Sequence, residues 1–173
     1  IDRMGRLVSD LLILAKTDRH DFVRPELTNV AELLDSVLAR VAPLARRDWQ
    51  LDHTLNEIVL LDAQRIVQAL VQLVDNAIKH TRDSDVIALG AVRNGPMIEF
   101  WVRDTGEGIE ESQRNLIFER FAQANPESEG FGLGLTIVSA IANAHGGTLT
   151  LDEQMPDEDG ATFRIRITQK EDS

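Results

Sequence analysis

The 173-residue sequence contains no cysteine, and it is short of positive charge and of long apolar runs. Without cysteine the chain forms no disulfide bond and no thiolate zinc site, and its redox compartment stays undetermined. No apolar run approaches the ~20 residues of a membrane span, and no signal peptide is recognisable. Lysine and arginine number 18 against 29 aspartates and glutamates, a net charge of −11. This charge argues against nucleic acid and anionic membrane surfaces as partners.

The length fits one domain, or one domain with an appendage. Hydrophobic residues make up 43% of the chain, which is enough for a core. The chain opens inside a helical pattern without a start methionine, so we expect a soluble piece of a longer protein. An acidic protein that binds a polyphosphate must concentrate positive charge locally or carry a metal.

Three alternating glycines, Gly130, Gly132 and Gly134, precede an apolar run that ends at His145-Gly146-Gly147. The run predicts a buried helix over 134–144, with one of the last two glycines as its stop signal. Glycines that lead into a helix N-terminus suit a phosphate, because bare backbone N–H groups point outward and no Cβ atom blocks close approach. Taken alone, the same pattern favours a tight turn before a core helix.

Residues 1–18 form an amphipathic pattern. Met4, Leu7, Leu11 and Leu14 alternate spacings of three and four, as in a coiled-coil seam. Such a helix is not stable alone, so the pattern predicts a partner helix and a dimer. The alternative is a helix packed on its own domain.

The next segments alternate between strands and one helix. An edge strand is expected around 22–28, and Asn29 with Glu32 makes a capping box for a helix over 29–47 that Pro43 should kink. Two strands, 49–55 and 57–61, follow.

Asp62 is a good N-cap for a largely buried helix over 63–80. Four polar side chains nevertheless fall in one stripe on this helix: Gln68, Gln72, Asn76 and Lys79. Buried amides and an ammonium without partners cost about 1–3 kcal/mol each or more, so a polar ligand is favoured over simple exposure to solvent.

Asn94-Gly95 predicts a hairpin between strands 85–93 and 97–103. The second strand runs into Asp104-Thr-Gly106-Glu-Gly108-Ile109. Two glycines and an acid at the end of a strand can form the bottom of a pocket for a flat ligand. A carboxylate there can accept a hydrogen bond from an exocyclic amine. A short helix over 111–121, a lid-like loop over 122–129 and strands at 148–152 and 161–168 complete the chain.

In this order, the motifs resemble the catalytic, ATP-binding domain of sensor histidine kinases, within the wider group of gyrase, Hsp90 and MutL. Residues 72–81 are similar to the N box, 104–109 to the G1 box, 118–121 to the F box and 130–135 to the G2 box. Closing elements at 144–147 and 160–163 extend the resemblance to about 25–168. Residues 1–18 resemble the second helix of the family's dimerisation and phosphotransfer hairpin.

The resemblance implies an α+β fold, a two-layer α/β sandwich known as the Bergerat ATP-binding fold. Its mixed sheet is covered by helices on one face, and a coiled-coil-type helix precedes it. Residues 1–20 would be the C-terminal part of the hairpin, and 21–173 the catalytic domain.

The resemblance also assigns roles by position. Asp104 should bind the adenine amino group, with Ile109 against the ring and His80 flanking the nucleotide. Asn76 should coordinate Mg²⁺, with Gln72 as a second metal candidate, and Lys79 should contact a phosphate. The remaining residues implied in nucleotide binding are Gly106, Gly108, Gly130, Gly132, Leu133, Gly134 and Thr162.

Three features depart from the family's pattern. Gln72 stands where the N box usually begins with asparagine, and the lid segment is short and acidic, with Arg120 as a substitute cation. None of the four histidines, His20, His53, His80 and His145, has the sequence context of a phosphoacceptor.

The implied activity is transfer of the ATP γ-phosphate to a histidine on a hairpin outside this chain, and then to a response-regulator aspartate. The expected partners are that hairpin, a response-regulator receiver domain and a second copy of the protein, without nucleic acid. The piece would be cytoplasmic, and the whole protein attached to the bacterial inner membrane. Alternatives are a nucleotide-binding scaffold, or pseudokinase, and an anti-sigma-factor serine kinase. The N-terminal helix argues against the serine kinase. Hydrolysis of the gyrase type is disfavoured as well, because Gln72 stands where those enzymes have a glutamate base, and glutamine cannot abstract a proton.

Overall fold

The computed structural model describes residues 3–118, 133–154 and 158–169. The helices are α1 (Arg3–Lys16), α2 (Val30–Val41), α3 (Ala63–Lys79) and α4 (Gly134–Ala144), with 3₁₀ turns at Ala42–Leu44, Glu111–Gln113 and Leu116–Phe118. The strands are β1 (Glu26–Asn29), β2 (Asp48–His53), β3 (Ile58–Leu61), β4 (Val86–Asn94), β5 (Met97–Asp104), β6 (Thr148–Leu151) and β7 (Thr162–Thr168).

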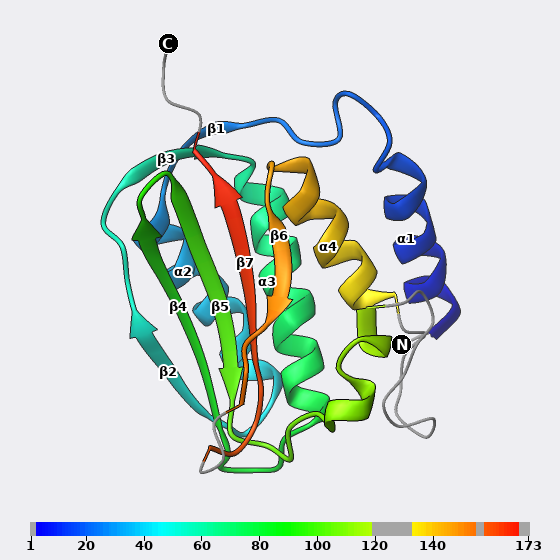
Figure 1. Ribbon diagram of the computed structural model, residues 1–173, viewed down its shortest axis with the longest axis vertical. Helices are drawn as coiled ribbons and strands as arrows, with labels where there is room; N and C mark the ends of the chain where they lie inside the picture. The colour runs from blue at the N-terminus through cyan, green and yellow to red at the C-terminus, as the bar shows by residue number, and fades with distance from the viewer. Residues whose placement is uncertain (1–2, 119–132, 155–157, 170–173) are drawn as a thin grey trace.

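Five strands form one mixed sheet in the order β2-β4-β5-β7-β6, in which β2 and β4 are parallel and the other pairs antiparallel. The helices α2, α3 and α4 cover one face of this sheet, and α1 lies beyond α4 (Figure 1). This confirms the expected α+β sandwich with helices on one face. A separate antiparallel ribbon joins β1 and β3.

The core lies between the sheet and the three covering helices. It is built from fully buried aliphatic and aromatic side chains, which alternate along the strands and recur every three to four residues along the helices. Its largest members include Leu34, Ile66, Leu70, Leu73, Ile87, Leu89, Phe100, Ile137, Ile141 and Ile165.

Helix α3 begins where its cap residue predicts. The Asp62 carboxylate accepts a hydrogen bond from the backbone N–H of Arg65 at 3.1 Å. The helix runs for 17 residues to Lys79, so its last turn brings Lys79 and His80 to the end of the sheet where β5 finishes.

Two predicted helices are corrected. The helix expected over 29–47 ends at Val41, and Pro43 lies in a following 3₁₀ turn instead of kinking a continuous helix. Proline lacks the N–H that the next helical bond needs, so the regular α-helical hydrogen bonding stops there. The helix expected over 111–121 is replaced by two 3₁₀ turns, because among its consecutive apolar residues 116–118 only Ile117 is buried and no helical stripe forms. Residues 119–121 lie outside the described part.

Helix α1 packs on its own domain through part of the predicted seam. Leu14 is buried and Leu7 is packed against the core, on the side facing α4. Four apolar side chains of the same helix are exposed: Met4, Val8, Leu11 and Leu12. The helix therefore has one face covered by its own domain and one apolar face at the surface.

His145 joins the end of α4 to the start of α3. Its Nε2 accepts a hydrogen bond from the backbone N–H of Asp62 at 3.1 Å, because that N–H can only donate. The proton must then sit on Nδ1, which donates to the carbonyl oxygen of Ile141 at 2.8 Å. Burial lowers the pKa of His145, which keeps the ring neutral.

Protonating His145 should cost stability. Its pKa in the folded protein lies below the unfolded value of about 6.5, so the unfolded state takes up the proton first. We expect the free energy of unfolding, measured in urea, to be largest above pH 6.5 and to fall as the pH drops below it. His145→Gln should flatten this slope and cost about 1 kcal/mol near pH 7 for the lost hydrogen bond. His20→Gln, in the exposed linker, is the control for the substitution. A slope that persists in His145→Gln would contradict the assignment.

Candidate functional site

The strand β5 ends in a buried carboxylate. Asp104 is only 4% exposed, and its Oδ1 accepts a hydrogen bond from the backbone N–H of Gly106 at 2.9 Å. The following loop is held to its neighbours, because the hydroxyl of Thr105 accepts from the N–H of Val86 at 2.9 Å and Asp104 N–H donates to the carbonyl of Ala161 at 2.9 Å. The acid is therefore fixed at the rim of the sheet, on the side that the helices cover.

Burial raises the pKa of Asp104, and the Gly106 N–H opposes that rise. A carboxylate in such a place is poised to accept a hydrogen bond from a ligand amine, because a donor that reaches it meets little competition from water.

Two glycines let this loop meet the end of α3. A Cβ atom on Gly106 would lie 2.1 Å from the carbonyl oxygen of His80, so no side chain fits there. Gly108 adopts a φ of +75°, and a Cβ on it would lie 3.0 Å from the carbonyl oxygen of Gly160. The motif's glycines are thus required by close backbone approach and by left-handed backbone geometry.

The last turn of α3 carries charged and polar groups beside this loop. Lys79 Nζ lies 3.1 Å from a carboxylate oxygen of Asp75, and His80 Nδ1 lies 3.6 Å from Glu107. The half-buried amide of Asn76 makes no hydrogen bond to any residue that the structure describes. Asn76, Lys79 and His80 therefore share one end of the helix with the loop that carries Asp104.

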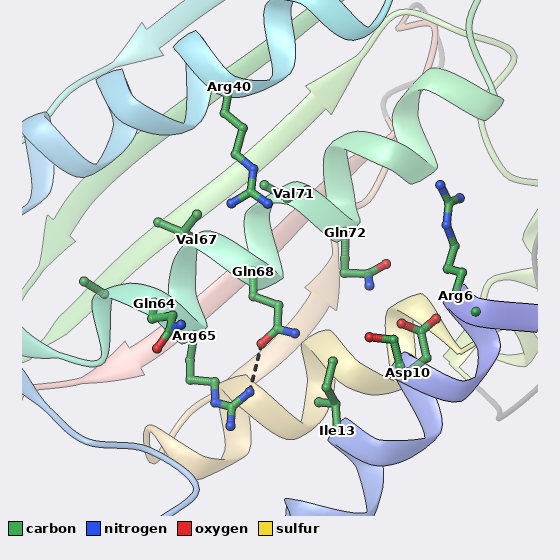
Figure 2. Close-up of a pocket in the computed structure, with 13 residues that line it drawn as sticks. Arg6, Asp10, Ile13, Arg40, Gln64, Arg65, Val67, Gln68, Val71 and Gln72 are labelled. Atoms are coloured by element: carbon green, nitrogen blue, oxygen red, sulfur yellow. Dashed lines mark hydrogen bonds between the residues drawn. The ribbon is translucent and has the colours of Figure 1, made fainter. Parts of the chain in front are cut away.

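The other two amides of the predicted polar stripe face a groove between α1, α2 and α3. This groove has a volume of about 880 Å³ (Figure 2). Gln68 lines it and accepts a hydrogen bond from Arg65 at 3.0 Å. Gln72 lines it too, on the side where Asp10 of α1 lies. The stripe is therefore shared between the groove and the end of the helix.

Gln72 also touches the start of α4. Its Oε1 lies 3.0 Å from where a Cβ on Gly134 would stand, so Gly134 gives the amide room. Leu133 beside it is buried, and the first hydrogen bond of α4 runs from Ile137 N–H to its carbonyl. Gly130 and Gly132 lie outside the described residues, as do Phe121 and Arg120.

Thr162 stands apart from the other predicted residues. It pairs with Arg103 across the β5–β7 ladder, and both lie on the open face of the sheet, whereas Asp104 lies on the covered face. Thr162 lines a separate cavity of about 360 Å³ with Arg103 and Asp152. Ile109 is partly buried against the core near the loop.

Arg47 contacts this site, although the sequence alone does not predict it. Arg47, just before β2, has a side chain only 7% exposed, and its guanidinium binds the end of α3 through Ile78 and Thr81. Its acceptors lie 31 and 34 residues away in the sequence, so no local pattern marks it.

The sequence of this domain matches a known family. A sequence model described as "Histidine kinase-, DNA gyrase B-, and HSP90-like ATPase" matches residues 61–171, well over half of the chain. The chain belongs to this ATPase family. Within the family, its relatives are sensor histidine kinases, and the expected ATP-binding catalytic domain is confirmed.

Relatives and solved structures agree with this membership. The sensor protein SrrB of Staphylococcus aureus is 31% identical over 178 residues, which cover 98% of this chain and 30% of that protein. The mycobacterial sensor histidine kinase MprB has a similar structure, with a TM-score of 0.74 and 27% identity over 85% of this chain and 99% of that one. ShkA, solved full-length in complex with AMPPNP, matches with a TM-score of 0.77 and 30% identity over 95% of this chain and 36% of that one. The chain thus spans about a third of the length of the curated relatives it matches.

The described residues contain no helix long and apolar enough to span a membrane. Over the same ranges, no group of three or more histidine, aspartate or glutamate side chains is placed to hold a metal ion.

Gly106→Ala tests the contact between the loop and α3. The added Cβ would meet the His80 carbonyl, so we expect a loss of about 1–3 kcal/mol in unfolding free energy and weaker nucleotide binding. Gly95→Asn is the control: no atom lies within 4 Å of a Cβ there, and asparagine tolerates the φ of +59°. Urea unfolding and nucleotide titration of both variants check the prediction, and a wild-type result for Gly106→Ala would refute it.

Proposed function

We propose that this chain is the ATP- and Mg²⁺-binding kinase domain of a two-component sensor histidine kinase. The observation that carries the proposal is the buried Asp104 carboxylate, held by Gly106 directly beneath the end of α3. ShkA, which resembles this chain over nearly its whole length, was solved with the ATP analogue AMPPNP.

Asp104 would accept a hydrogen bond from the adenine amino group. Gly106 and Gly108 would let the ring approach the backbone closely, with Ile109 against it and His80 at the flank. The proposal is supported by the contact of this loop with the end of α3, where a Cβ on Gly106 would meet the His80 carbonyl at 2.1 Å. Thr162 is left out of the proposed contacts, since it faces the opposite side of the sheet.

Mg²⁺ fits the amide of Asn76 best. A carboxamide oxygen is a hard ligand, and Mg²⁺ commonly takes only one or two protein ligands together with substrate phosphates. The Asn76 amide is half-buried and makes no hydrogen bond to a described residue, so it is available. When bound, the metal neutralises charge on the phosphates. Gln72 remains the second metal candidate, although it lies between α1 and Gly134.

The phosphates would lie along Lys79 and the start of α4. The N–H groups of Leu133 and Gly134 open a helix N-terminus, where anions are stabilised. Gly130 and Gly132 are proposed to continue this cradle. Lys79 is paired with Asp75, so a phosphate must compete with that carboxylate for its ammonium.

We assign residues 1–20 to the second helix of a dimerisation and phosphotransfer hairpin, and 21–173 to the catalytic domain. The exposed apolar face of α1, formed by Met4, Val8, Leu11 and Leu12, supports packing against further helices in a homodimer. The phosphoacceptor would be a histidine of that hairpin, since His145 is engaged in structural hydrogen bonds and the other three lack the phosphoacceptor context.

The whole protein would pass the phosphate on to a receiver-domain aspartate of a response regulator and would be attached to the bacterial inner membrane. Nucleic acid is not a proposed partner, given the net charge of −11.

A nucleotide-binding scaffold without phosphoryl transfer is the second candidate. Gln72 favours it, because its amide is turned toward the groove beside α1. A serine kinase of the anti-sigma type is less favoured, because α1 is present. Joining the chain to a phosphoacceptor hairpin and assaying phosphohistidine would separate the kinase from the scaffold.

The nucleotide assignment is tested by calorimetric titration with AMPPNP, with and without Mg²⁺. We expect AMPPNP to bind more weakly without the metal. In Asn76→Ala the affinity should be at least about tenfold lower, because roughly one charge-assisted contact is lost. Gln64→Ala is the matched control, an exposed amide on the same helix. Equal affinity in Asn76→Ala and the control would remove Asn76 from the metal site, and no binding by the wild-type chain would sink the kinase proposal.

A further inference from the structure

The guanidinium of Arg47 is almost fully buried and uses all five of its N–H groups. The side chain is 7% exposed, although it carries a full charge. Nε donates to the Thr81 hydroxyl at 2.8 Å, one terminal nitrogen donates to the carbonyls of Ile78 and Thr81 at 3.1 Å each, and the other donates to the Arg46 carbonyl at 2.8 Å and to Asp83 at 3.3 Å. Because every donor of this buried guanidinium has an acceptor, the side chain is held in one position.

Three of these five acceptors lie at the end of α3 or just after it, one on Ile78 and two on Thr81. The last carbonyls of a helix have no partner within it, and a cation there is also favoured by the helix dipole. The Thr81 hydroxyl extends the contact, since it donates to the carbonyl of Ala77 at 2.7 Å while accepting from Arg47. Asp83 is 76% exposed and adds little to the arrangement. Arg47 therefore ties the end of α3 and the residues that follow it to the segment before β2.

The segment that Arg47 clamps is the one that meets the nucleotide loop. Lys79 and His80 lie between its acceptors Ile78 and Thr81. The His80 carbonyl rests against Gly106, whose N–H holds the Asp104 carboxylate. A shift of the helix end thus reaches Asp104 through two contacts, from the His80 carbonyl to Gly106 and from the Gly106 N–H to the Asp104 carboxylate.

We propose that Arg47 is a positioning residue that sets the preference of this site for adenine over guanine nucleotides. The inference rests on the proposed function, because it assumes that Asp104 reads the adenine amine. Adenine offers an amine where guanine offers a carbonyl, so a carboxylate held in place accepts from the first and repels the second. Discrimination of this kind depends on how closely the acceptor is held.

Arg47→Lys is the first test, because lysine keeps the charge but places all its donors on one nitrogen and cannot span the acceptors. The dissociation constants of AMPPNP and GMPPNP are measured by calorimetry on the whole chain. We expect the ratio of the GMPPNP dissociation constant to the AMPPNP dissociation constant to be about tenfold lower in Arg47→Lys than in the wild type. Partial unfolding would weaken the binding of both nucleotides by the same factor and leave the ratio of their dissociation constants unchanged. Arg46→Lys is the matched control, an exposed neighbour whose side chain lies outside the clamp.

Thr81→Val supplies an independent second variant, since it removes the hydroxyl that Arg47 binds. It should lower the ratio too, and the double variant should lower it no further than Arg47→Lys alone. If wild type prefers AMPPNP and both single variants keep that preference, the inference is overturned while the proposed function stands. If Arg47→Lys does not fold, an unchanged ratio in Thr81→Val overturns it. If the wild-type chain binds neither nucleotide, the proposed function falls, and the inference with it.

Discussion

The approach of the His80 carbonyl to Gly106 is the constraint on which the candidate site depends. It brings the end of α3 against the loop after β5, so that a helix and a strand far apart in sequence share one edge. Each side of this contact is fixed separately. Asp62 and Arg47 fix the two ends of α3, and the ladder with β4 and β7 fixes Asp104. A protein with a net charge of −11 thereby places Lys79 and the amide of Asn76 at the end of α3 that meets the Asp104 loop.

Elements with local signals were predictable from the sequence. The Asp62 cap starts α3, the Asn94-Gly95 turn sets the β4–β5 hairpin, and Gly146, with a φ of +74°, follows the end of α4. Other features depend on contacts between distant segments. The parallel pairing of β2 with β4, and the ribbon between β1 and β3, leave no trace in periodicity. Pro43 predicts an interruption of the helix, but whether a helix bends or stops at a proline depends on what can pack beyond it.

The residues of the candidate site likewise divide into those with a local sequence signal and those placed by contacts between distant segments. Asp104, Gly106 and Gly108 could be found from one short motif, because the chemistry and the backbone demands fall within five residues. Gln68 and Thr162 could not be placed by spacing alone, because a helix stripe and a strand register each need a neighbour to decide which side is inside. Arg47 had no local signal at all, since its role appears only when the fold brings it to Thr81.

Recognition of the adenine amine by the buried Asp104 carboxylate is the interaction on which the proposed site depends. The most direct measurement compares the binding of adenosine and inosine imidotriphosphates to the unaltered chain by calorimetry, since the two ligands differ at the exocyclic group that Asp104 would contact. We expect the inosine ligand to bind at least about tenfold more weakly, because a buried acceptor loses its donor. Equal affinities would contradict the claim and assign the nucleotide's recognition to other residues.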